Sequence, residues 1–114
     1  MTDFACKNIK IEQLVRCSFT LTKTEYNLLL FLVDNEFIGT TNQLSKKMKL
    51  ERTTIQKAIT KLLDKNLVER RQKNLEHGGY SFFYNSKPKK EIRLKIKEIV
   101  NTWHKKTESA ITDF

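Results

Sequence analysis

The sequence predicts one mainly α-helical domain that carries a small β-hairpin. The chain has 114 residues, which is a single-domain length. Apolar residues recur at helical spacing through most of the chain. Between residues 67 and 85 the pattern changes to that of two strands around a Gly78–Gly79 pair. We therefore expect a single domain over residues 1–114, with a core at residues 20–88 and a terminal helix at residues 89–110.

Two helices are expected in the first third of the chain. Ile11, Leu14 and Val15 have helix-like spacing, which predicts a short first helix. Thr22 and Glu25 form a capping box, in which the hydroxyl and the carboxylate each satisfy a free backbone N–H, so they mark the start of a second helix. The apolar run behind Thr22 is nearly continuous. This second helix should therefore be the most buried one in the fold.

A short helix followed by a longer one is expected next. Thr40 or Thr41 caps a short helix whose apolar face consists of Leu44 and Met48. A tight connection then leads into a longer helix at about residues 52–65. A short helix, a turn of about three or four residues and a longer helix together make a helix-turn-helix arrangement.

The longer helix has an outer face that is poor in acids. Ile59 and Leu62 fall within about 40° of Ile55 at 100° per residue, so these three residues should face the core. The opposite face and its flanks carry Thr53, Thr54, Gln56, Lys57, Thr60 and Lys61. Asp64, at the far end, is its only acid. A solvated face usually mixes Glu with Lys, so this face is more typical of one that meets a polyanion. Asn66 can close the helix by taking the left-handed conformation.

Residues 67–75 and 80–85 are expected to form the two strands of the hairpin, with Gly78–Gly79 as its turn. The hairpin carries the basic or titratable residues Arg70, Arg71, Lys73 and His77. A slip of one residue in register would exchange its two faces, so the face that meets a partner stays open. The aromatic residues Tyr80, Phe82, Phe83 and Tyr84 fit packing in a strand better than a stacking platform for single-stranded nucleic acid.

The last helix, at residues 89–110, begins after Pro88 and has one narrow stripe. The stripe consists of Ile92, Ile96, Ile99, Trp103, Thr107 and Ala110. It is too thin to add much to a monomer core, yet a tryptophan needs burial. Pairing with a second copy is the simplest solution, and packing onto its own domain is the alternative. The predicted dimer interface comprises Ile11, Leu14, Ile92, Ile96, Ile99 and Trp103.

The formal net charge of +9 is concentrated in the middle of the chain. Residues 1–40 hold 4 Lys/Arg and 5 Asp/Glu, and residues 91–114 hold 5 and 4. Residues 41–90 hold 13 Lys/Arg and 4 Asp/Glu. A localised excess of positive charge indicates a polyanionic partner.

Several classes of function are not expected. Glycine occurs only at positions 39, 78 and 79, so a glycine-rich phosphate loop cannot be written. His, Cys and carboxylates lack metal-site or acid–base spacing, so we expect no enzyme, metal or cofactor. The longest apolar run, "LLLFLV", is too short for a bilayer, and we expect a cytoplasmic, nucleoid-associated protein without membrane contact. Cys6 and Cys17 then fit reduced thiols, with a redox switch or an intersubunit disulfide left open.

From about Thr20 to Trp103 the chain resembles the winged-helix transcriptional regulators of the MarR-like and TrmB-like kind. The matching features are "LTKTEYNLLLFLV", the block "QLSKKMKLERTTIQKAITKLLDKNLVERR", the wing return "GGYSFFY" and a trailing amphipathic helix. The resemblance implies a winged helix-turn-helix fold and a homodimer whose N- and C-terminal helices form the interface. It also implies that residues 52–65 lie in the major groove of double-stranded DNA, with the wing at residues 67–85 on the backbone or minor groove.

The resemblance further implies roles for single residues. The residues that it implies read bases are Arg52, Thr53, Thr54, Gln56 and Lys57. It places Thr60 and Lys61 at phosphate or at the groove edge. The residues that it implies contact the DNA backbone are Arg70, Arg71, Lys73 and His77, and Thr41 also belongs to the DNA-binding set. Glu51 and Asn66 depart from the family pattern. At position 66 these proteins more often have glycine. No small-molecule effector is expected.

The chemistry of these side chains agrees with the resemblance. Gln can bond bidentately to adenine, Arg or Lys to guanine, and the Thr methyl can pack against that of thymine. Lysines on the same face neutralise phosphates and supply affinity that does not depend on sequence. Two other functions stay open, which are a protein-interaction module that grips an acidic partner and an RNA-binding winged helix.

Overall fold

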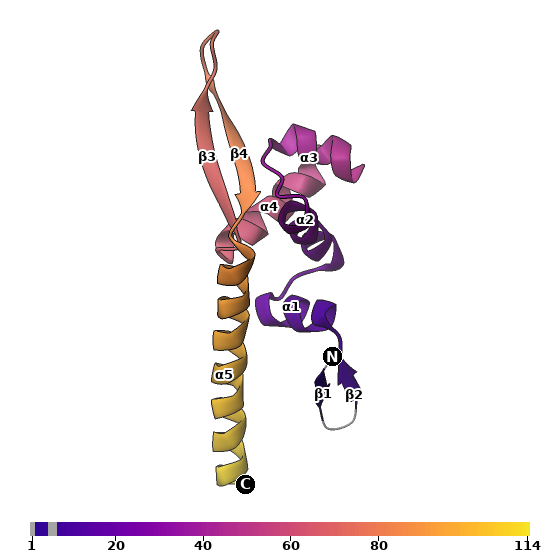
Figure 1. The fold of residues 1–114 in the computed structure, drawn as a ribbon, viewed down its shortest axis with the longest axis vertical. Helices are drawn as coiled ribbons and strands as arrows, with labels where there is room; N and C mark the ends of the chain where they lie inside the picture. Colours follow the sequence, from indigo (N-terminus) through magenta and orange to yellow (C-terminus); the bar gives the residue numbers. More distant parts are fainter. Residues whose placement is uncertain (1, 5–6) are drawn as a thin grey trace.

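The computed structural model describes residues 2–4 and 7–114. Its elements are β1 (Thr2–Phe4), β2 (Lys7–Ile9), α1 (Ile11–Phe19), α2 (Lys23–Asp34), α3 (Thr41–Met48), α4 (Arg52–Asp64), β3 (Val68–Asn74), β4 (Tyr80–Ser86) and α5 (Lys89–Asp113). Helices α2, α3 and α4 lie together in the middle, the β3–β4 hairpin rises from one side of them, and α5 runs the opposite way (Figure 1). The molecule is therefore elongated, with extents of 65 × 23 × 23 Å. The predicted mainly helical winged helix-turn-helix fold is confirmed.

The core lies between α2, α3, α4 and the base of the hairpin. Leu28 and Leu32 of α2 and Ile55, Ile59 and Leu62 of α4 are fully buried. This confirms the predicted apolar face of α4, whose polar residues are consequently turned outward. Helices α2 and α4 each contribute four buried residues, but α2 is shorter and has fewer exposed positions, so the prediction that α2 is the most buried helix is confirmed.

Capping boxes fix where α2 and α3 begin. The Glu25 amide donates to Thr22 Oγ1 at 3.3 Å and the Thr22 amide donates to Glu25 Oε1 at 2.8 Å. Thr40 and Gln43 form the same reciprocal pair at 3.2 and 2.9 Å, so Thr40 is the cap of α3. At the end of α4 the backbone of Asn66 is left-handed, with φ of +59°, as predicted.

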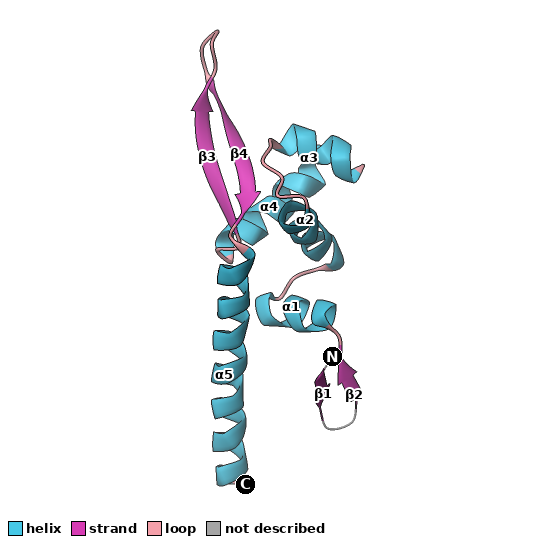
Figure 2. Cartoon of the chain, in the orientation of Figure 1, coloured by secondary structure: helices cyan, strands magenta, loops and turns pink. Residues whose placement is uncertain are grey.

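The hairpin is antiparallel and is tied to the helix-turn-helix at its base (Figure 2). Gly39, just before α3, exchanges two backbone hydrogen bonds with Tyr84 of β4, with N···O distances of 3.1 and 2.8 Å. Gly78 and Gly79 take φ of +92° and +77° in the turn, a conformation that favours glycine. The wing therefore starts from a fixed position beside α3 and α4 and reaches well beyond them.

Two features differ from the sequence-based expectation. The short β1–β2 hairpin was not predicted, because strands of 3 residues are too short to show a period. Helix α5 continues to Asp113, beyond the predicted end at residue 110. It has 25 residues, and only its first turns meet the core, through α1 and Ile92.

Candidate nucleic-acid interface

One side of α4 offers polar and basic side chains to the outside. Arg52, Thr53, Gln56, Lys57 and Thr60 are exposed, whereas Thr54 and Lys61 are half-buried. The Thr60 hydroxyl donates to the backbone oxygen of Gln56 at 2.9 Å, so its methyl group is the part left for a partner. Glu51 precedes the helix, and its side chain makes no capping hydrogen bond.

An open hollow of about 480 Å³ lies between α4, the start of α3 and the β3–β4 hairpin. Its walls are formed by Thr40, Thr41, Asn42, Arg52, Gln56, Arg70, Tyr80, Ser81, Phe82 and Tyr84. Arg52 and Gln56 come from α4, Thr41 from α3 and Arg70 from the wing, so four predicted DNA-binding residues from three elements border the same space. Thr41 is only 8% exposed, so it shapes this wall rather than presenting a free side chain.

The register of the hairpin decides which face borders the hollow. Arg70 pairs with Tyr84 and Gln72 with Phe82, so these four side chains share one face. The Arg70 guanidinium lies over the Phe82 ring at 4.5 Å from its centre. This is the face that turns toward α4 and borders the hollow.

The other face of the hairpin holds a charge cluster around Glu69. Its carboxylate accepts a hydrogen bond from Asn85 Nδ2 at 3.3 Å and lies 3.4 Å from Lys87 Nζ and 3.5 Å from Arg71 Nη2. The hydrogen bond from Asn85, and next the one from Lys87, lower the pKa of Glu69 below its ordinary value. Arg71 is therefore partly neutralised, and Lys73 shares its side of the ribbon. The predicted wing contacts are thus divided between two faces.

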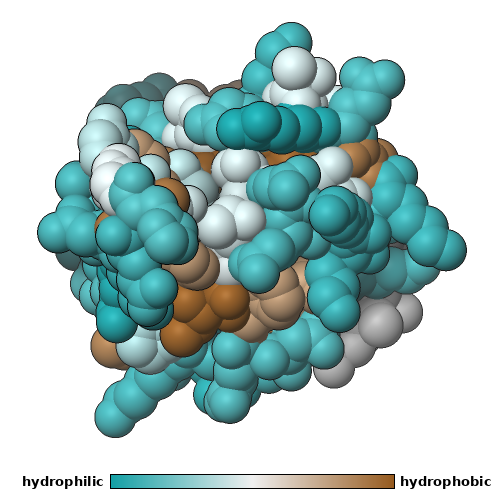
Figure 3. All heavy atoms as spheres, turned by 90° about the horizontal axis from the view of Figure 1, so that it is seen from above, coloured by the Kyte–Doolittle hydropathy of each residue, from teal (hydrophilic) through white to brown (hydrophobic). Residues whose placement is uncertain are grey.

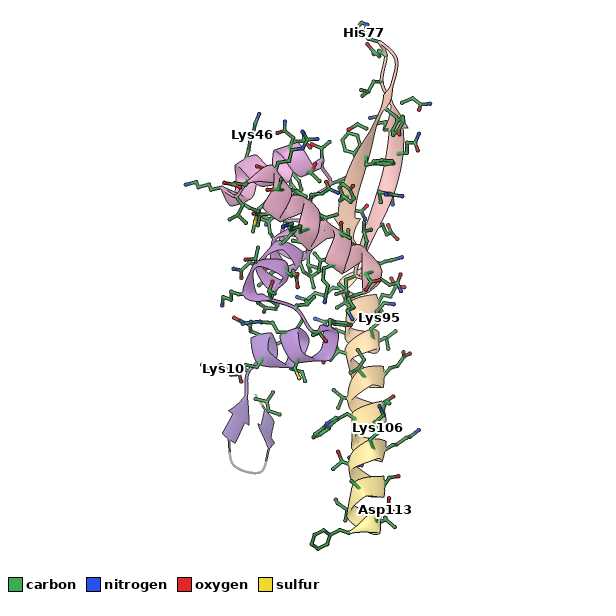
Figure 4. The ribbon with its side chains drawn as sticks, turned by 180° about the vertical axis from the view of Figure 1, so that it is seen from behind. Lys10, Lys46, His77, Lys95, Lys106 and Asp113 are labelled. Carbon is green, nitrogen blue, oxygen red and sulfur yellow. The ribbon has the colours of Figure 1, made fainter. Side chains whose placement is uncertain are left out.

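Positive charge also extends to positions that were not singled out from the sequence. Lys46 and Lys47 of α3 and Lys49 after it are exposed. Figure 4 shows Lys46 at the same end of the molecule as His77, which marks the tip of the wing, while Lys95 and Lys106 lie along α5. Seen from the wing end, the surface is mostly hydrophilic, with smaller hydrophobic patches between the polar side chains (Figure 3). Helical spacing from Leu44 could have placed Lys46 on the outer face of α3, but it puts Lys47 on the side of Leu44, and Lys49 follows the end of the helix.

Residues 11–107 match the family model of the DnaD N-terminal domain. The chain belongs to this family. It is 31% identical over 108 residues to an uncharacterized protein, MJ1082, of Methanocaldococcus jannaschii, covering 95% of this chain and 88% of the relative. A solved structure of a "possible transcriptional regulator" from Methanosarcina mazei Go1 is 34% identical, with a TM-score of 0.92 over 100% of this chain and 96% of the other.

A second solved structure, the ST1889 protein of Sulfolobus tokodaii, is 22% identical, with a TM-score of 0.70 over 84% of this chain and 93% of the other, and shares the fold. The matches agree with the winged-helix part of the resemblance. The narrower MarR-like or TrmB-like kind stays a prediction.

The predicted dimer residues of this DnaD-type domain fall into two groups. Ile92 is 7% exposed and belongs to the core of its own domain. Ile96 and Ile99 pack partly against that core, and Leu14 is half-buried. Ile11 and Trp103 are 66% and 53% exposed in a single copy, so they retain apolar surface for a partner.

The remaining sequence-based sites concern thiols, metals and membranes. Cys17 is an exposed free thiol on α1, and Cys6 lies outside the described residues. Among the described residues, no group of three or more His, Cys, Asp or Glu could hold a metal ion. Within the same part of the chain, none of the helices has the length and apolar character needed to cross a membrane.

Proposed function

We propose that the chain is a transcriptional regulator, without enzymatic activity, that binds specific sequences of double-stranded DNA as a homodimer. Helix α4 lies in the major groove, and the β3–β4 wing follows the backbone toward the minor groove. One observation carries this proposal. The exposed side of α4 and the Arg70 face of the wing border one open, polar hollow, in a region of the chain that holds nearly all of the net charge.

The side chains of α4 suit the edges of base pairs. Arg52 and Gln56 stand one helical turn apart on the exposed side, where they can bond bidentately to guanine and adenine. Thr53 and Thr60 offer methyl groups for thymine. Lys57 and the half-buried Lys61 supply contacts to phosphate, which add affinity for any sequence.

The Methanosarcina mazei relative supports the regulatory part of the proposal. That protein carries the description "possible transcriptional regulator", and it is similar over the whole of this chain. A role in transcription implies a protein of the cytoplasm that associates with the nucleoid. We place the DNA-binding core at residues 20–88 and the dimerisation helix at residues 89–110.

The homodimer is supported by the exposed apolar side chains of α5 and α1. Trp103 and Val100 of α5 and Ile11 of α1 are all exposed in one copy. Burying them against a second copy would remove this apolar surface from water and would pair two recognition helices. The two copies of α4 should then stand about 34 Å apart, which is one turn of DNA.

A binding titration tests the proposal. A fluorescein-labelled duplex of random sequence is titrated with the full chain at about 50 and 200 mM salt, and anisotropy is read. We expect binding that weakens steeply with salt, and tighter binding to duplexes selected from a random DNA pool. An RNA duplex of the same sequence should compete poorly. Absence of salt-dependent binding would favour a protein-bridging module, and better competition by RNA would favour an RNA-binding winged helix.

A further inference from the structure

The tip of the wing, residues 74–80, lacks basic side chains and exposes two large apolar ones. Leu75 and Tyr80 are 50% and 58% exposed at the end of a ribbon whose residues 70–80 are all exposed. The tip contains no Lys or Arg, and the only residues in it that can carry charge near neutral pH are Glu76 and His77. The basic residues of the wing stand nearer its base. A tip of this composition has little electrostatic attraction to phosphate, so its contacts with DNA should be of another kind.

The two apolar side chains are held in place by the turn. The Leu75 amide donates to the Gly79 carbonyl at 3.1 Å, and the Gly78 amide donates to the Leu75 carbonyl at 3.3 Å. The Tyr80 ring packs edge-on against Phe82, with ring centres 5.3 Å apart. Asn74 pairs with Tyr80, so the alternation of the strand places Leu75 on the opposite face. The tip therefore presents one apolar side chain on each face of the ribbon.

The outside of the turn is open to another molecule. A Cβ atom added to Gly78 or Gly79 would meet nothing within 4 Å. The tip also extends past α3 and α4, with His77 at its extremity (Figures 1 and 4). A surface of DNA could therefore approach the tip without meeting the rest of the domain.

We infer that this tip is an apolar wedge that enters the minor groove beside the α4 site and bends the DNA. The inference rests on the proposed function. The minor groove is about 6 Å wide, and a ribbon with side chains on both faces is roughly 10 Å thick, so entry requires the groove to open. Leucine and aromatic side chains enter the minor groove and partly unstack base steps, which kinks the duplex toward the major groove. The cations nearer the base, with Arg70 on the α4 face, hold the flanking phosphates.

Bending can be measured separately from binding. A duplex of about 30 base pairs, labelled at its ends with a donor and an acceptor dye, is saturated with the full chain, and energy transfer is read. We expect a rise in transfer that corresponds to a bend of about 20° or more. The variant Leu75→Ser/Tyr80→Ser should lose most of this rise. Its affinity should fall by less than about tenfold and its salt dependence should stay unchanged, because phosphate contacts supply most of the binding.

Two further variants complete the experiment. Ile38→Ser changes an exposed aliphatic residue in the loop before α3 and should bend DNA like the wild type. Leu75→Ser alone removes one exposed side chain and should reduce the bend in part, without affecting the fold. A wild-type complex with a straight duplex, or a double variant that bends it fully, would overturn the wedge while the proposed function stands. Absence of binding in the anisotropy titration would instead remove the proposed function and the wedge with it.

Discussion

The guanidinium of Arg70 lies 4.5 Å from the centre of the Phe82 ring, on the face of the hairpin that borders α4. The next residue, Arg71, lies 3.5 Å from the Glu69 carboxylate on the opposite face. Two adjacent arginines thus have different surroundings. Arg70 keeps its charge free of any carboxylate ion pair within the described residues and stands beside the α4 site, whereas Arg71 is engaged by Glu69.

Arg70→Gln should weaken duplex binding more than Arg71→Gln. The first change removes a cation that faces the hollow, with an expected loss of about tenfold, which is the size of one charged hydrogen bond. The second removes a cation already partly neutralised. Anisotropy titrations at one salt concentration measure both. Equal losses would indicate that the two faces of the wing approach DNA alike.

Lys57→Gln should weaken binding to every duplex sequence and reduce the slope of log affinity against log salt by about one, because one phosphate contact is lost. Lys106→Gln is the matched control, since Lys106 lies along α5, away from α4 (Figure 4). The control should leave the slope unchanged. If both variants flatten the slope equally, positive charge acts as a general field and α4 is not the contact surface.

Gln56→Ala should change which sequences are preferred rather than overall affinity for random duplex. A bidentate contact between Gln and adenine discriminates against other bases by about 1–3 kcal/mol. Selection from a random DNA pool, performed with the wild type and the variant, would show relaxed preference at one position of the site. An unchanged selected site would exclude Gln56 from base reading.

Trp103→Ala should convert a dimer to monomers. An aromatic anchor at the centre of an interface contributes about 2 kcal/mol or more, so the dimer should dissociate at concentrations roughly 30-fold higher or more. Light scattering over a dilution series measures this. Leu94→Ala is the control, because Leu94 is exposed on α5 outside the Trp103 stripe. A wild type that is monomeric at micromolar concentration would contradict the pairing of α5.

Glu69→Gln should remove part of the acid sensitivity of the fold. The pKa of Glu69 is lowered in the folded state, first by the Asn85 hydrogen bond and then by Lys87. The stabilisation is therefore present above the ordinary carboxyl pKa of about 4.3 and is lost as pH falls through the folded value. Because Glu69 and Lys87 are partly exposed, the contribution of Glu69 to the free energy of unfolding should be at most about 1 kcal/mol.

Melting temperatures at pH 7 and pH 3 test this linkage. The wild type should lose more stability between the two pH values than Glu69→Gln, whereas Glu98→Gln on α5 should behave as the wild type. An acid sensitivity that is the same in all three proteins would contradict a role for the Glu69 cluster.

Local patterns in the sequence were sufficient for most of the helices. The capping residues Thr22 and Glu25, the Ile55–Ile59–Leu62 face and the left-handed Asn66 involve neighbours within a few residues. Such interactions depend on the spacing of residues along the chain, so the sequence alone was enough to predict them. The polar face of α4 was then predicted as the side of the helix opposite its apolar face.

Long-range packing decided the rest. Thr41 is buried at the start of α3, where it forms part of the wall beside the hairpin, and Ile92 is buried because α5 begins beside the core. Their sequence patterns do not differ from those of surface or interface residues. Only the positions of elements distant in the sequence distinguish these buried residues from surface or interface residues.

The sequence by itself determined a basic winged-helix domain with an acid-poor outer face on α4, because helix periodicity and charge are properties of short segments. The tertiary structure decided that the Arg70 face of the wing, and not the Arg71 face, shares a hollow with Arg52 and Gln56. The physical reason is that strand alternation allows either face, and the packing of the hairpin base against α2 and α4, together with the hydrogen bonds between Tyr84 and Gly39, chooses between them.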